Sequence, residues 1–222
     1  MADIVLNFEN TLLRRTDVQL LYGPFWLNDQ IISFYLEFLE KVRYKDHSNQ
    51  LLFVCPEVVQ CVKMVSPSEI DLFLEPLNAN QKSFIFFPLN DNDEDQAGGS
   101  HWSLLVFSRN EQTFFHFDSF VNSGNFRHCL SFARHIAAAL KCPEFDVQTS
   151  ECVQQSNGYD CGVHVLCNID CVAQQVIEVG HVELDDDELN SDDNAIMKIT
   201  SVAFKNKRND LLNVIKELGG NI

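Results

Sequence analysis

The chain has 222 residues, 45% of them hydrophobic, which is enough to bury the core of one ordinary domain, so we expect residues 1–222 to form a single catalytic or binding domain. The formal net charge of -16 would repel phosphate backbones, which disfavours a nucleic-acid partner but not a basic protein partner. No basic N-terminal stretch precedes a long apolar run, and no apolar run reaches about eighteen residues, so neither a secretory signal nor a membrane span is predicted.

The first long predicted element is a helix over 28–42, because apolar residues recur there at helical spacing. Asn28 or Asp29 is placed to cap it. Two shorter helical segments follow, over 57–65 and 67–74, each opened by a proline in its first turn.

The middle of the chain predicts strands. An apolar run over 84–89 has strand length, and the polar segment 90–100 behind it predicts a flexible loop. Two further apolar runs, 102–107 and 113–118, flank a turn-prone segment and predict an antiparallel hairpin.

The last third of the chain predicts a helix over 124–140, a strand over 145–149, an apolar helix over 162–179 and a helical tail over 194–218. Gly219-Gly220 after the tail invites comparison with a ubiquitin-like precursor, but a glycine directly after a helix is more often its C-cap, and we interpret it as a cap. The elements together predict an α+β domain with helices at both ends of a central sheet.

The eight cysteines form no CxxC pair, and a chain of this length folds without disulfides, so we expect reduced thiols in the cytoplasm or nucleus. Cys167 and Cys171 lie four residues apart in the apolar helix, which leaves a zinc site open. Such a pair usually belongs to the core. No metal and no other cofactor is predicted.

The predicted hairpin suggests a first pair of chemical groups. A hairpin centred near Asn110 pairs residues whose numbers sum to about 219, which sets His101 opposite Asp118. A carboxylate bonded to one imidazole nitrogen fixes the tautomer and leaves the other nitrogen free to take a proton. Taken alone, a His and an Asp at the end of a hairpin are more often incidental than catalytic.

Cys161 lies where the loop 154–160 becomes the apolar helix. A thiol there meets the positive end of the helix dipole and free backbone N–H groups, which stabilise its thiolate. Beside a histidine it would be a nucleophile. The alternative, a buried core thiol, fits Cys167 and Cys171 better. Gln155 could direct its amide to an oxyanion, although a lone glutamine in a loop is usually only solvated.

Four short motifs occur in a recognisable order: His101-Trp102, Asp118-Ser119, Gln155 and Asp160-Cys161-Gly162. The order resembles that of the ubiquitin-like-protein-specific cysteine proteases and differs from papain-type enzymes, whose cysteine comes first. The resemblance covers most of the chain, and the deneddylating members are the most similar. It implies an adenain-like fold, a mostly antiparallel central sheet flanked by helices, with Cys161 as nucleophile, His101 as base, Asp118 as orienting carboxylate and Gln155 as oxyanion donor.

The resemblance also implies substrate-binding roles. Trp26 and Trp102 match two tryptophans that wall a tunnel over the substrate's C-terminal tail, although a single tryptophan is more often core. Flat aromatic walls can close on a diglycine tail and exclude any residue that has a Cβ. Asp29 could pair with an arginine that precedes the diglycine, or it could simply cap the helix.

The expected function is hydrolysis of the bond after the C-terminal diglycine of the neddylation modifier, by a monomeric enzyme. The expected partners are that modifier and its conjugates, such as cullins, in the cytoplasm and nucleus. The acidic runs 91–95 and 183–193 depart from the family, and we expect them to be solvated loops that affect the choice of modifier, not the chemistry.

Three alternatives remain open. The nearest is a protease for SUMO, with ubiquitin a weaker choice. An acetyltransferase of the bacterial-effector type uses a similar order of residues, but no basic cluster in the sequence marks a site for the phosphates of acetyl-coenzyme A. A catalytically silent binding module would be surprising, because all four catalytic positions are filled.

Overall fold

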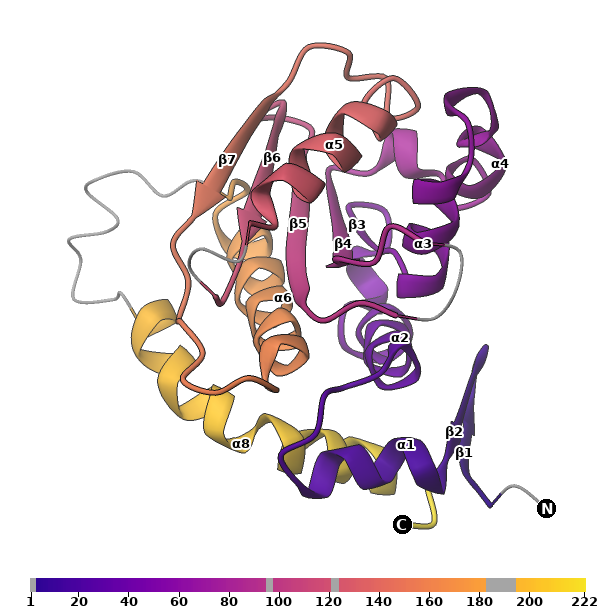
Figure 1. The fold of residues 1–222 in the computed structure, drawn as a ribbon, viewed down its shortest axis with the longest axis vertical. Helices are drawn as coiled ribbons and strands as arrows, with labels where there is room; N and C mark the ends of the chain where they lie inside the picture. The colour runs from indigo at the N-terminus through magenta and orange to yellow at the C-terminus, as the bar shows by residue number, and fades with distance from the viewer. Residues whose placement is uncertain (1–2, 95–97, 121–123, 183–194) are drawn as a thin grey trace.

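The computed structural model describes residues 3–94, 98–120, 124–182 and 195–222, and its centre is a five-stranded sheet (Figure 1). The strands are, in spatial order, β3 (Leu51–Phe53), β4 (Phe84–Asn90), β5 (Trp102–Ser108), β6 (Thr113–Phe117) and β7 (Asp146–Ser150). Antiparallel pairing joins the three central strands, and parallel pairing adds β3 and β7 at the edges. The α+β class is confirmed. The sheet is mixed, and the hairpin that the sequence predicts supplies two of its strands, β5 and β6.

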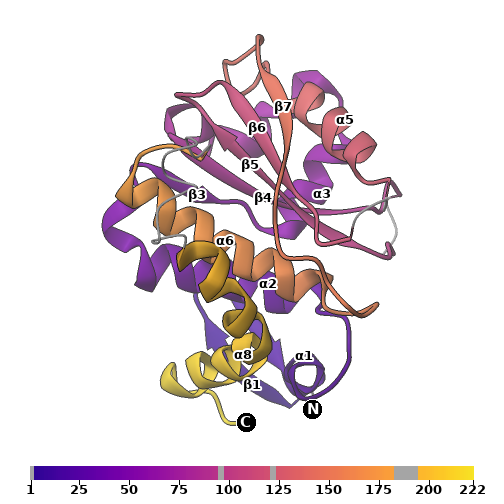
Figure 2. The same cartoon turned by 90° about the vertical axis from the view of Figure 1, so that its left-hand side faces the viewer.

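Helices cover both faces of the sheet (Figure 2). One face packs against α2 (Asp29–Phe38) and α6 (Cys161–Glu178), and α8 (Ala195–Glu217) packs on the far side of α6. The other face packs against α3 (Pro56–Met64), α4 (Asp71–Leu74) and α5 (Phe126–Ile136). Strand residues alternate between two hydrophobic cores: Phe84 and Phe86 face α2 and α6, while Ile85 and Phe87 face α3 and α5. Burial on both faces explains why these strands are continuous apolar runs.

An N-terminal unit that the sequence did not predict precedes α2. It contains the hairpin of β1 (Ile4–Phe8) and β2 (Thr11–Arg14), then α1 (Arg15–Gln19). The C-terminus joins it, because the Asn221 backbone N–H donates to the carbonyl of Val5 at 3.1 Å. Short helical turns complete the fold: Leu20–Tyr22, Leu39–Arg43, Lys45–His47, Pro67–Glu69 and Ala79–Gln81.

Most predicted elements are confirmed to within a few residues. The predicted helix over 28–42 is α2 continued by the π-helical turn Leu39–Arg43. Asn28 caps α2, since its Oδ1 accepts from the Ile31 backbone N–H at 3.1 Å, so the capping role falls to Asn28 and not to Asp29. The predicted helix over 124–140 is shorter than expected, because α5 ends at Ile136 and looser turns follow.

The hairpin is confirmed, but its predicted register was wrong. Leu104 pairs with Phe117 and Ser108 with Thr113, so paired numbers sum to 221 instead of 219. The turn is centred later because Gln112 takes a left-handed conformation, with φ 50°. Side chains alternate with a period of two, so a shift of two in the sum leaves the same residues on the same face.

The tail helix is also confirmed. α8 ends in a glycine cap: Gly219 has φ 90°, and the N–H groups of Gly219 and Gly220 donate to the carbonyls of Lys216 and Ile215. The acidic run 183–193 and residue 95 of the run 91–95 lie outside the described residues. Among the helices that are described, none is long and apolar enough to cross a membrane.

Candidate active site

His101 and Asp118 meet beyond the paired ends of β5 and β6. The imidazole Nε2 lies 2.7 Å from Asp118 Oδ1, and both side chains are about one-tenth exposed. Asp118 Oδ1 also accepts from the Phe120 backbone N–H at 3.0 Å, which holds the carboxylate in place. The corrected hairpin register therefore still brings the predicted pair together.

Asp91 holds the other side of His101. Its carboxylate accepts from the backbone N–H groups of Ser100 and His101, at 2.6 and 3.1 Å, and from the Ser100 hydroxyl at 2.6 Å. Burial works against its ionisation, but these hydrogen bonds keep the pKa of Asp91 below its ordinary value. Asp91 was interpreted from sequence as part of a solvated acidic run. The sequence signal that could have indicated a structural role is the position of Asp91 directly after the apolar run that forms β4.

Cys161 is the first residue of α6 and is 2% exposed. Its thiol lies within hydrogen-bonding reach of His101, and the nitrogen that Asp118 leaves free on that ring is Nδ1. Gly162 lets the start of α6 approach the segment before α2 closely, because a Cβ there would lie 3.1 Å from the Cβ of Leu27, next to Trp26. The start of α6 is thus packed tightly between His101 and the segment before α2.

The surroundings of His101 favour the charged form of its imidazole. Burial lowers the pKa of His101, but hydrogen bonds to Asp118 and Cys161 outweigh it and raise the pKa to about 9. Cys152 provides a contrast. Its Sγ donates to the Asp118 carbonyl at 3.2 Å, and burial raises its pKa to about 11, so it remains a thiol at neutral pH.

Gln155 is fixed by three hydrogen bonds. Its backbone N–H donates to the Ser119 carbonyl at 2.8 Å, and its Oε1 accepts from the Ser119 hydroxyl at 2.8 Å. Its Nε2 donates to the Asn157 carbonyl at 2.6 Å. An amide nitrogen carries two N–H bonds, so one remains for a substrate oxygen. Ser119, the second half of the Asp118-Ser119 motif, therefore orients the amide.

The two tryptophans differ. Trp26 is 49% exposed, and its indole N–H donates to the Gly158 carbonyl at 2.6 Å, which ties it to the loop before Cys161. Trp102 is 7% exposed, and its indole N–H donates to the Leu27 carbonyl at 3.2 Å. Trp102 also lines a groove of about 380 Å³, whereas Trp26 is not among the lining residues.

The same groove is lined by Asp29 at the start of α2, together with Pro88 and Gly98. Partial burial, with a smaller contribution from Glu57, raises the pKa of Asp29. Asp29 lines the groove, and Glu57 on α3 adds to the negative potential around it, so the electrostatics suit a basic ligand group.

Arg208 is a site residue that the sequence did not reveal. From α8 it donates to Asp160 Oδ1 through Nη2 at 2.6 Å and to the carbonyls of Leu20 and Phe25 at 2.6 and 2.7 Å. One guanidinium thus joins the residue before Cys161 to the segment that leads into Trp26. No motif marks an arginine in an ordinary amphipathic helix, so sequence reasoning had no signal for it.

The remaining cysteines are free, and Cys167 and Cys171 lie in the packed body of α6. Burial raises the pKa of Cys171 to about 11. Within the described part of the chain, no three His, Cys, Asp or Glu side chains group as metal ligands.

Comparisons with known proteins identify a family. Residues 25–205 match the family described as "Ulp1 protease family, C-terminal catalytic domain". Human sentrin-specific protease 8 is 41% identical over 177 residues, which cover 78% of this chain and 83% of that protein. NEDD8-specific protease 1 of Arabidopsis thaliana is 36% identical over 172 residues, or 74% of this chain and 73% of that protein.

A solved structure supports the fold. The C-terminal Ulp1 protease domain in complex with Smt3, the yeast ortholog of SUMO, superposes with a TM-score of 0.64 and 21% identity, covering 95% of this chain and 90% of that one. The adenain-like fold is therefore confirmed. The family match over most of the chain leads to one conclusion: this chain belongs to the Ulp1 protease family and is a cysteine peptidase.

Proposed function

We propose that the chain is a deneddylase, which hydrolyses the bond after the C-terminal diglycine of the neddylation modifier. The reaction would release the modifier from lysines of its targets and trim its precursor. The observation that carries the proposal is the Cys161, His101 and Asp118 arrangement in a chain that is 36% identical to a protein named NEDD8-specific protease 1 and 41% identical to one named sentrin-specific protease 8.

The geometry supports thiol-dependent hydrolysis. Cys161 Sγ attacks the carbonyl carbon of the terminal glycine, and the carbonyl electrons move onto the oxygen, which the Gln155 amide and the Cys161 backbone N–H stabilise. The imidazolium of His101 then gives its proton to the leaving amine as the C–N bond breaks. Water, deprotonated by His101, attacks the resulting thioester and releases the carboxylate and the thiol.

The C-terminal tail of the modifier would lie along the approach to Cys161. Trp102, beside His101, and Trp26, bound to Gly158, flank the start of α6, where a tail without side chains can pass. We propose that both tryptophans contact the diglycine and that Asp29 receives a basic residue before it.

Parallel cleavage of fluorogenic C-terminal derivatives of the neddylation modifier, SUMO and ubiquitin tests the proposal. The neddylation modifier should be cleaved with the highest kcat/KM, and Cys161→Ala should abolish turnover while modifier binding persists, because the nucleophile contributes little to tail recognition. A preference for SUMO would overturn the choice of modifier. Failure of a vinyl sulfone probe to label Cys161 would overturn the nucleophile assignment.

Asp29 can be tested by a double-mutant cycle. If Asp29 pairs with an arginine of the tail, Asp29→Ala and removal of that arginine should be coupled by about 1.5–3 kcal/mol in kcat/KM. Since Asn28 caps α2, Asp29→Ala should leave the melting temperature nearly unchanged. Additive effects on kcat/KM would show that the two groups do not meet.

We propose further that residues 1–222 act as a single monomeric catalytic domain on conjugates such as cullins, in the cytoplasm and nucleus. Eight free cysteines suit a reducing compartment. Immunoblots of neddylated cullins in cells that express wild type or Cys161→Ala would test the target class, because only the active enzyme should reduce the conjugated band.

A further inference from the structure

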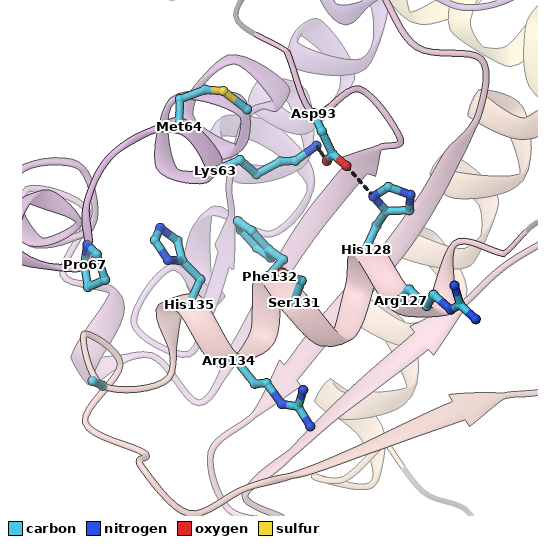
Figure 3. A pocket seen from close by; sticks show the side chains of 11 residues that line it. Lys63, Met64, Pro67, Asp93, Arg127, His128, Ser131, Phe132, Arg134 and His135 are labelled. Carbon is cyan, nitrogen blue, oxygen red and sulfur yellow. Dashed lines mark ion pairs between the residues drawn. The ribbon is translucent and has the colours of Figure 1, made fainter.

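A cavity of about 810 Å³ lies between α3 and α5 and contains none of the catalytic candidates (Figure 3). The loop after β4 borders it through Asp93. Basic and apolar side chains dominate its lining: Lys63, Met64, Pro67, Asp93, Arg127, His128, Ser131, Phe132, Arg134, His135 and Ala138. The sequence showed no basic cluster, because the fold brings these residues together from separate segments.

Asp93 has the single carboxylate among the residues that line the cavity, and it already contacts two basic side chains. Asp93 lies 2.9 Å from His128 Nδ1 and 3.4 Å from Lys63 Nζ, and Figure 3 shows the three side chains meeting on one side of α5. Arg127 and Arg134 are exposed and extend away from this group. Within the described residues, neither arginine takes part in an ion pair. The rim of the cavity therefore carries two arginines that form no ion pair with the residues that the structure describes.

Those charges act locally, although the whole chain is strongly acidic. At physiological ionic strength the Debye length is about 8 Å, so distant acidic residues are largely screened from a ligand that touches Arg127 and Arg134. A bidentate guanidinium–carboxylate contact would then decide affinity at this site.

The spacing of the arginines selects the shape of the ligand. Arg127, Ser131 and Arg134 share one face of α5, and seven residues along a helix span about 10.5 Å. In the extended polyproline II form, which has three residues per turn and a rise of about 3.1 Å per residue, side chains three residues apart lie on the same side of the chain and about 9 Å apart. Two carboxylates three residues apart on such a peptide match both arginines, whereas a single phosphate would reach both only if the two side chains bent toward each other.

We propose that this cavity binds an extended acidic segment of a partner protein, with two carboxylates on Arg127 and Arg134. An apolar side chain between the two acids packs against Met64, which is 41% exposed beside the cavity. Ser131, between the arginines, is placed to donate to the backbone of the segment.

Fluorescence anisotropy with a labelled nonapeptide, Gly-Ser-Glu-Leu-Ala-Glu-Ser-Gly-Gly, tests the proposal on the full chain. The double variant Arg127→Gln/Arg134→Gln should bind at least about tenfold more weakly than wild type. The matched control is Lys205→Gln/Lys216→Gln, because it removes the same charge from two exposed positions on α8. It should bind within about twofold of wild type. A peptide with Gln in place of both Glu should not bind.

Several results would overturn the proposal. One is the absence of binding to wild type, and another is equal weakening in the two double variants, which would reveal only long-range charge. Full competition by about 1 mM inorganic phosphate would assign the cavity to a phosphate. Self-association of wild type that disappears in Arg127→Gln/Arg134→Gln, seen by sedimentation, would make a second copy of the chain the occupant.

Discussion

The imidazole of His101 is held between two groups that favour its charged form. Asp118 binds one nitrogen at 2.7 Å, and the Cys161 thiol lies within reach of the ring. Burial opposes the charge, yet the pKa is raised to about 9, so the imidazolium is the main form at neutral pH. A positive ring beside Cys161 is the arrangement that stabilises a thiolate.

This raised pKa predicts a pH dependence. The imidazolium is present below about pH 9 and is lost above it, so kcat/KM should fall as the pH rises through about 9. Asp118→Asn removes the strongest contribution to the raised pKa, so the alkaline limb should move to lower pH and kcat should drop by about 10³–10⁴-fold. The pH–rate profiles of both proteins provide the measurement. An unmoved limb, or a rate within about twofold of wild type, would mean that Asp118 does not orient His101.

Gln155 shows how one residue can be aligned by its neighbours before substrate arrives. Ser119 donates to Oε1, and the Asn157 carbonyl accepts from Nε2, so the amide plane is fixed. Preorganised donors stabilise a developing oxyanion because they need no reorganisation during the reaction.

Gln155→Ala should lower kcat by about 10²-fold with a smaller change in KM, because the lost bond forms mainly in the transition state. Ser119→Ala should give a weaker effect of the same kind, since the amide stays but loses one constraint. Steady-state kinetics on a modifier substrate separate the two parameters. A change in KM alone for Gln155→Ala would contradict the oxyanion role.

At the scale of elements, α8 supports the site from outside it. The family match ends at residue 205, yet Arg208 bonds Asp160 and the carbonyls of Leu20 and Phe25. Its neighbour Lys207 instead points into the body of the fold, where it donates to the Tyr35 hydroxyl at 2.7 Å and pairs with Asp170. Adjacent cations of one helix thus serve different purposes.

Those two residues form a matched pair of variants. Arg208→Ala should lower kcat about 10- to 100-fold with a modest loss of melting temperature, because it releases the loop that positions Cys161. Lys207→Ala should lower the melting temperature more, because it leaves Asp170 and Tyr35 with one partner fewer, and should spare kcat in the protein that remains folded. Arg208→Lys should recover only part of the rate, since one ammonium cannot serve three acceptors in a fixed fork. Parallel losses of kcat and stability in both alanine variants would argue against a positioning role for Arg208.

At the scale of the whole molecule, most of the helices and strands could be predicted from local sequence patterns. The strands β4 to β7 and the helices α2, α3, α5, α6 and α8 follow from apolar periodicity and from proline and glycine signals. The candidate site followed from motif order, because His101, Asp118 and Cys161 lie at element boundaries where a short motif is visible. The hairpin register was missed because a left-handed Gln112 leaves no sequence signal.

Long-range relations were the part that sequence could not provide. β3 has three residues and is stabilised by parallel pairing with β4, and β1 and β2 depend on packing against the body of the fold, so neither shows a pattern of its own. The same limit hid Asp91 and Arg208, whose roles depend on partners far away in the chain. The basic cavity between α3 and α5 is a third example.

A histidine buried in the core also makes the stability of the whole molecule depend on pH. His116 pairs with Leu105 in the sheet, is 1% exposed, and its Nε2 has no hydrogen-bond partner among the described residues. Burial lowers its pKa to about 4, against the opposing effect of Asp118. Because the unfolded chain has the ordinary value of about 6.5, it binds more protons than the folded chain between pH 6.5 and 4, and stability is lost as the pH falls through that window.

Between pH 7.5 and 5 this single group should cost about 2 kcal/mol of the free energy of unfolding, by linkage. His116→Leu removes the titrating group and should flatten the dependence by about that amount, and His47→Gln, in the turn Lys45–His47, is the control for the loss of one histidine. Urea unfolding at the two pH values measures the effect as a difference between pH values, so any packing cost of leucine that is independent of pH cancels. If wild type and His116→Leu lose the same stability between pH 7.5 and 5, the acid sensitivity lies in other groups and His116 is not held neutral by its burial.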